Sequence, residues 1–136
     1  MKIILFLLCL SIVACDATNT YCGENSKSVT FIKSLTTKEK EYLFNTMKNL
    51  AQENPYGRYG SDKFPIPNEL EKYKFQGIKM FSKNSVIGYL ETCSFDYKVY
   101  ISFDFSQTHK NTGYMSLNWG GDLEHQSIEI YNIRDL

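Results

Sequence analysis

Residues 97–105 read YKVYISFDF, and this stretch decides the fold. Its odd-numbered positions are all apolar or aromatic, whereas Lys98, Ser102 and Asp104 lie at even-numbered positions. Side chains of a strand point alternately to opposite faces of a sheet, so this period of two predicts a strand with one buried face. The same alternation recurs in four neighbouring segments, 76–82, 85–93, 114–119 and 127–133. Because short links join them, we expect an antiparallel meander of four to five strands.

One amphipathic helix is predicted before these strands. Residues 36–39 match a capping box, in which Thr36 accepts a hydrogen bond from the backbone of Glu39 and the Glu39 side chain reaches back. Apolar residues then recur at helical spacing, at Leu43, Met47, Leu50 and Ala51. Residues 54–57, which read NPYG, end the pattern. We therefore predict a helix over residues 37–53 that packs on one face of the sheet.

The remaining segments are expected to be less regular. Residues 28–32 read SVTFI and are predicted to be extended, and residues 54–68 hold all three prolines and predict a long loop. Residues 69–72 add a possible helical turn. The chain from 28 to 136 is thus predicted to be a single α+β domain. Its element order is similar to that of cystatin-like folds, but the Gln-x-Val-x-Gly loop of the protease-inhibiting cystatins is absent.

Composition sets limits on size and partners. The chain has 136 residues, 43% of them hydrophobic, which suits one domain with a real core. Its 15 basic residues are balanced by 15 acidic ones. A neutral chain has no basic excess to displace counterions, so we expect no nucleic-acid partner.

The first fifteen residues resemble an export signal. An apolar run, residues 3–13, follows the single charge of Lys2. At ~1.5 Å rise per residue, this run is well short of the ~20 residues that span a bilayer, so it predicts a secretory signal peptide.

Residues 12–15, Ile-Val-Ala-Cys, resemble the lipobox of bacterial lipoproteins. In that family the cysteine is diacylglycerated and the chain is cut just before it. The resemblance implies a signal peptide at 1–14, a lipid anchor on Cys15 and a tether at 15–27, and places the protein on a bacterial envelope membrane, facing the periplasm. Asp16 resembles an enterobacterial signal for retention in the inner membrane. The alternative is an ordinary leader cut after Ala17, which gives a secreted protein.

Two cysteines, one in the tether and one in the domain, remain after Cys9 and Cys15 are assigned to the leader and the anchor. In an oxidising compartment, Cys22 and Cys93 are expected to form a disulfide. It would close a loop of about 70 residues, for which the chain-entropy model gives ~4 kcal/mol of stabilisation.

Aromatic loop residues are the candidates for binding a protein. One group, in the proline-containing loop, is Tyr56, Arg58, Tyr59 and Phe64. The other, in or beside the segment WGGDLEH, is Trp119, Asp122 and His125. Aromatic and Arg side chains are enriched at binding hot spots, and loops often carry function.

Catalytic patterns are weak. The carboxylates Glu91, Asp96 and Asp104 lie on or near predicted strands, but their spacing selects no pair. A metal site needs three or four ligands, and His109 is the only histidine besides His125. We predict no catalytic residue, no cofactor and no metal.

These features favour an envelope-anchored lipoprotein that binds a protein. An immunity protein, or an inhibitor that neutralises a toxin or hydrolase in the periplasm, fits this build. The alternatives are a small cell-envelope hydrolase that uses carboxylates or His125, and a passive structural lipoprotein.

Overall fold

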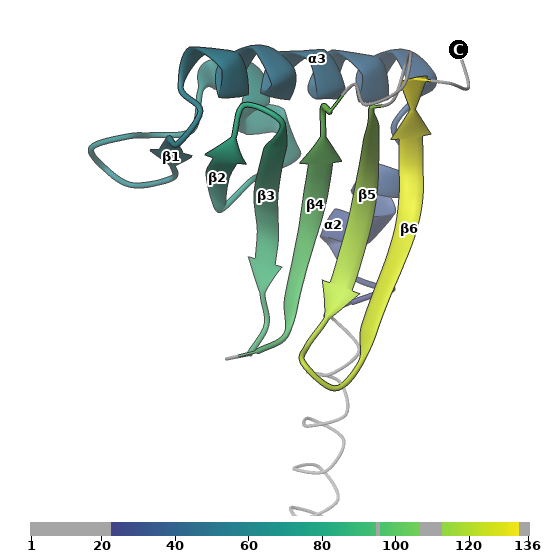
Figure 1. The fold of residues 1–136 in the computed structure, drawn as a ribbon. Coiled ribbons are helices and arrows are strands. Elements are labelled where there is room, and N and C mark those ends of the chain that lie inside the picture. Colours follow the sequence, from purple (N-terminus) through teal and green to yellow (C-terminus); the bar gives the residue numbers. More distant parts are fainter. Residues whose placement is uncertain (1–22, 95, 107–112, 134–136) are drawn as a thin grey trace, which may run out of the picture.

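A six-stranded antiparallel sheet organises the chain (Figure 1). The computed structural model describes residues 23–94, 96–106 and 113–133. The helices are α2 (Lys27–Lys33), α3 (Thr37–Glu53) and the short 3₁₀ helix η1 (Asn68–Tyr73). The strands are β1 (Arg58–Tyr59), β2 (Gly77–Ser82), β3 (Ser85–Thr92), β4 (Lys98–Asp104), β5 (Tyr114–Gly120) and β6 (His125–Asn132).

The predicted α+β class and the antiparallel meander are confirmed, since the strands lie in chain order from β1 to β6. The predicted number of strands is wrong by one or two, because β1 pairs with β2 inside the expected loop. Two residues between two glycines, Gly57 and Gly60, are too few to show a period of two. β1 therefore has no signature in the sequence.

Helix α3 has the bounds that its pattern predicts, Thr37–Glu53. The backbone N–H of Glu39 donates to Thr36 Oγ1 at 3.2 Å, and the backbone N–H of Thr36 donates to Glu39 Oε1 at 3.4 Å. The capping box is therefore confirmed. The buried side chains of α3 are Leu43, Phe44, Met47 and Ala51.

Residues 28–32 were expected to be extended, and this prediction is wrong, because they lie in helix α2. The Ser26 hydroxyl caps α2 by accepting from the backbone N–H of Val29 at 3.2 Å. Val29 and Ile32 are both buried, three residues apart, which is a helical spacing. A stretch of five residues is too short to distinguish a helical period of about 3.6 from a strand period of two. Here the Ser26 cap and the burial of Val29 and Ile32 in the core favour the helix.

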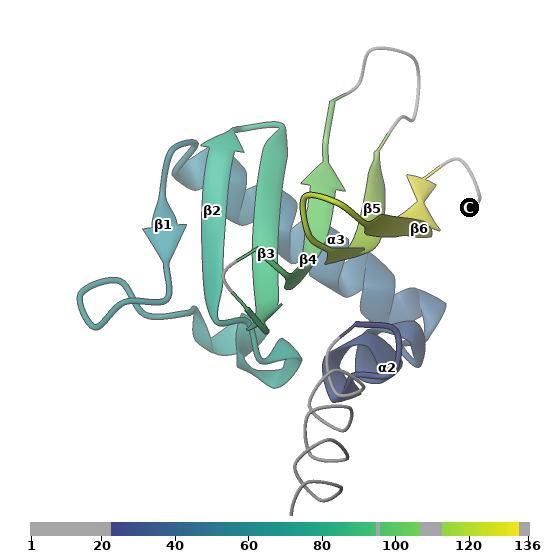
Figure 2. The same cartoon turned by 90° about the horizontal axis from the view of Figure 1, so that it is seen from below.

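Both helices and η1 lie on one side of the sheet (Figure 2). The strands turn alternate apolar residues toward them, so that Val99, Ile101 and Phe103 of β4 are buried. Phe44 of α3 packs between Phe105 and Tyr131, with ring centroids 5.0 Å apart in both pairs. The hydrophobic core therefore fills the space between the helix layer and this face of the sheet.

The opposite face of the sheet is covered by no helix in the described part of the chain (Figure 2). Residues that are direct partners across strands share a face, so the register defines its members. Members of this open face include Arg58, Lys79, Ser85, Ile87, Tyr89, Thr92, Lys98, Tyr100, Ser102, Asp104, Tyr114, Ser116, Asn118, His125, Ser127 and Glu129.

Candidate functional site

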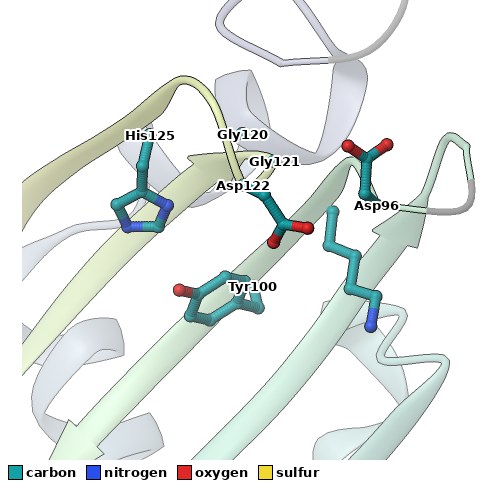
Figure 3. Close-up of a pocket in the computed structure, with 7 residues that line it drawn as sticks. Asp96, Tyr100, Gly120, Gly121, Asp122 and His125 are labelled. Carbon is teal, nitrogen blue, oxygen red and sulfur yellow. The ribbon is translucent and has the colours of Figure 1, made fainter.

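The open face ends in a pocket of about 290 Å³ (Figure 3). Strand β4 supplies Lys98 and Tyr100, and His125 begins β6. The pocket is lined by Asp96, Lys98, Tyr100, Gly120, Gly121, Asp122 and His125. Figure 3 shows the Asp122 side chain extending toward Tyr100, whereas the Asp96 carboxylate points the other way.

Three rings form a row across the open face and into this pocket. The ring centroids of Tyr89 and Tyr100 are 6.2 Å apart, and those of Tyr100 and His125 are 6.0 Å apart. The Lys98 Nζ atom lies 5.8 Å from the centroid of the Tyr89 ring, which is a cation–π distance. The row thus combines the flat ring surfaces of two tyrosines and a histidine with the polar groups that these side chains and Lys98 carry.

Two glycines shape the turn beside the pocket. Gly120 has a φ of +135°, and a Cβ there would lie 2.1 Å from the carbonyl oxygen of Glu124. The backbone N–H of Gly121 donates to that same oxygen at 2.8 Å. A Cβ on Gly121 would meet the Asp96 carboxylate at 3.1 Å. The predicted turn at these glycines is therefore tight, and it brings Asp122 and His125 over β4.

Burial raises the pKa of the Tyr100 phenol above its ordinary value, and the neighbouring Tyr89 acts in the same direction. Tyr100 therefore keeps its proton at neutral pH and can donate a hydrogen bond to a partner. Asp96, Asp122 and His125 are all exposed. No hydrogen bond joins His125 to either carboxylate within the described ranges, so the pocket lacks a preorganised acid–base pair.

The three carboxylates considered for glycosidic chemistry do not converge. Glu91 accepts a hydrogen bond from Ser28 Oγ of α2 at 2.5 Å, on the helix side of the sheet. Asp104 accepts from the backbone N–H of Ser106 at 2.8 Å, near the other end of β4. Asp96 accepts from Ser94 Oγ at 3.3 Å. Glu91 thus links β3 to helix α2, whereas Asp96 and Asp104 each accept from a residue two positions away in the chain.

Trp119 was predicted to join Asp122 and His125 in binding, but the structure places it on the other side of the sheet from His125. Its side chain is only 7% exposed and belongs to the hydrophobic core. The Lys33 Nζ atom of α2 lies 5.3 Å from the centroid of the Trp119 ring. Trp119 therefore faces the helix layer, because it alternates along β5 with the open-face residue Asn118.

The predicted aromatic group of the proline loop lies elsewhere, at the β1 edge of the sheet (Figure 1). Tyr56 and Phe64 are exposed, at 79% and 53%. Arg58 is exposed and shares the open face with its partner Lys79, whereas Tyr59 packs against the core. The structure thus separates the predicted binding residues into two places.

Sequence reasoning missed Tyr89 and Tyr100 as site residues. Both alternate with apolar neighbours, which made them resemble ordinary sheet residues. Their pairing across the β3–β4 hairpin brings them together with His125. Only the register between strands, which the sequence does not state, could have identified them.

Cys93 is disulfide-bonded. The other three cysteines, including Cys15 and Cys22, lie outside the described residues, so the pairing with Cys22 stays a prediction. No helix in the described ranges is long and apolar enough to cross a membrane. Among the same residues, no three His, Cys, Asp or Glu side chains are grouped to hold a metal ion.

Comparison with known protein families, curated proteins and solved structures finds no match for this chain.

Proposed function

We propose that the protein is an envelope-anchored lipoprotein that binds another protein through its open face. It acts as an immunity protein or inhibitor, neutralising a toxin or hydrolase in the periplasm, with Cys15 as its lipid anchor. The observation that carries the proposal is the row of Tyr89, Tyr100 and His125, on the sheet face that none of the described helices covers.

Two features support contact recognition on this face. Tyrosine offers a large, rigid area together with a hydroxyl, and it is enriched at protein interfaces. The strands hold these side chains in a fixed register, which lowers the entropy that binding must overcome. The pocket beside Tyr100 adds a concave end that a partner side chain can enter.

A small hydrolase is the second candidate, because the pocket brings Asp122 and His125 to the same place as Tyr100. We rank the hydrolase lower, because the Asp122 carboxylate and the His125 imidazole are exposed and no hydrogen bond joins them in the described structure. General acid–base catalysis needs groups within hydrogen-bond reach of each other or of a substrate atom.

Purified variants separate the two candidates. With a partner enriched from envelope extract and then purified, Tyr100→Ala and His125→Ala are expected to weaken saturable binding, each by about tenfold or more. Tyr42→Ala is the matched control, because Tyr42 is an exposed tyrosine on helix α3 and not on the open face. It should leave the affinity within about twofold.

The result that contradicts binding by the open face is an affinity that Tyr100→Ala leaves unchanged. An enzyme predicts a different pattern, in which Asp122→Asn or His125→Ala abolishes turnover of a wall or sugar substrate while the fold is kept. Intact mass of the envelope-extracted protein tests the anchor separately, since Cys15→Ser should remove the lipid mass.

A further inference from the structure

A second cavity, of about 230 Å³, lies on the helix side of the sheet, away from the open face. Helix α2 contributes Lys27, Ser28 and Phe31 to its wall. η1 and the residue after it contribute Lys72, Tyr73 and Lys74. We call this cavity, between α2 and η1, the lysine slot.

Positive charge is concentrated at the lysine slot. Three of its six lining residues are lysines and none is acidic, in a chain whose overall charges balance. The Lys72 Nζ atom lies 5.0 Å from the centroid of the Tyr73 ring, so it stands above an aromatic surface. Ser28 already donates its hydroxyl hydrogen to the Glu91 carboxylate, so the lysines are the groups of the slot that can attract an anion. The slot therefore favours an anion at its rim.

The wall between these lysines is mainly apolar. Tyr73 is 1% exposed and forms a rigid part of it, whereas Phe31 is 41% exposed. Phe31 is therefore an apolar side chain that the core leaves partly uncovered, on a helix whose Val29 and Ile32 are fully buried. An alkyl group in the slot would cover this exposed area.

We infer that the lysine slot binds an amphiphile with an anionic head, a carboxylate or a phosphate monoester on an alkyl chain. The head contacts the lysine ammonium groups by charge-assisted hydrogen bonds, and the chain lies against Phe31 and Tyr73. This inference does not depend on the proposed function, since the slot and the open face lie on opposite sides of the sheet.

Free amphiphiles and anionic membrane phospholipids share this chemistry. If Cys15 carries a lipid, the twelve residues from Cys15 to Lys27 reach at most about 40 Å, so the slot stays near the membrane. The test therefore needs one arm with a free amphiphile and one arm with vesicles.

In the first arm, calorimetry measures binding of decanoate and decyl phosphate to the purified full chain, with 1-decanol as the uncharged probe. We expect saturable binding of the two anions, with 1-decanol weaker by roughly tenfold or more. Lys72→Gln/Lys74→Gln should weaken binding of the anions by a similar factor. The matched control, Lys38→Gln/Lys83→Gln, removes the same charge from two exposed lysines outside the slot.

In the second arm, vesicles of phosphatidylcholine are compared with vesicles that also contain phosphatidic acid, whose head is a phosphate monoester. Binding that requires phosphatidic acid and Lys72 with Lys74, without binding of free anions, assigns the ligand to the membrane. Binding of free anions assigns it to a soluble amphiphile. The inference is overturned if neither arm binds, if 1-decanol binds as tightly as decanoate, or if the two double variants behave alike.

Discussion

At the scale of single residues, Tyr73 combines full burial with an unsatisfied hydroxyl. The side chain is 1% exposed, and its hydroxyl has no hydrogen-bond partner among the described residues. Burial raises the pKa of this phenol above its ordinary value, and the nearby Lys72 opposes the rise. An unpaired buried hydroxyl costs free energy, since folding removes it from water without replacing the lost hydrogen bond.

Tyr73→Phe is therefore expected to keep or raise the free energy of unfolding at neutral pH, by up to about 1 kcal/mol.

Above pH 10 the unfolded tyrosine ionises before the buried one, so the wild-type protein loses stability as pH rises. The variant should lose less, although Tyr100 and Tyr131, whose pKa values burial also raises, still contribute. Urea unfolding at pH 7 and pH 10.5 measures both effects, with Tyr114→Phe as the exposed control. A loss above about 1 kcal/mol at pH 7 would contradict the unpaired hydroxyl.

Gly120 and Gly121 are adjacent but make different demands on the backbone. Gly120→Ala should cost about 1–3 kcal/mol, because a φ of +135° strains any residue with a Cβ and the Glu124 carbonyl occupies its space. Gly121→Ala meets mainly the side chain of Asp96, so we expect about 1 kcal/mol or less. Thermal unfolding of the two variants compares them directly. Equal stability losses would show that the tight turn beside the pocket does not require Gly120.

At the scale of elements, the two helices show when a sequence pattern is sufficient. α3 has seventeen residues, a capping box and a repeated apolar spacing, so its bounds were predictable. α2 has only seven residues, with β-branched Val29, Thr30 and Ile32, which favour strands. Its helical form depends on the Ser26 cap and on burial against the core, and the second of these is not visible in a short stretch.

Thr36→Ala tests the cap that made α3 predictable. Removing the Thr36 hydroxyl leaves the backbone N–H of Glu39 without its acceptor, so the free energy of unfolding should fall by about 1 kcal/mol. Thr37→Ala, one residue later and equally exposed, should change it by no more than about 0.5 kcal/mol. Urea denaturation measures both values. If the two variants lose the same amount, the capping box does not stabilise α3.

At the scale of the whole molecule, the sequence predicted the helix–sheet order but not the site. The period of two in β4 identified its buried face, and short links implied the meander. The Tyr89–Tyr100–His125 row depends on which residues pair across three strands, with a shift of register between Tyr89 and Glu91. Such long-range pairing is set by packing, so neighbouring positions in the chain do not reveal it. The same register places Trp119 on the helix side of the sheet, away from His125.

The two sides of the sheet therefore have different roles. The helix side holds the core and the lysine slot, whereas the open face, which no helix covers in the described ranges, is the surface that we propose binds a protein. Three tyrosines lie on three different surfaces that a partner could contact. They are Tyr100 on the open face, Tyr42 on α3 and Tyr56 in the proline loop. Tyr42 and Tyr56 are 47% and 79% exposed, so both are accessible to a partner.

Site-specific photo-crosslinking tests the open face most directly. Each of Tyr100, Tyr42 and Tyr56 is replaced singly by a photoreactive phenylalanine analogue, and the variants are irradiated with the purified partner. We predict a crosslinked complex from position 100, which excess unlabelled protein suppresses, and little or none from positions 42 and 56. A complex that forms from position 42 or 56 but not from position 100 would contradict binding through the open face.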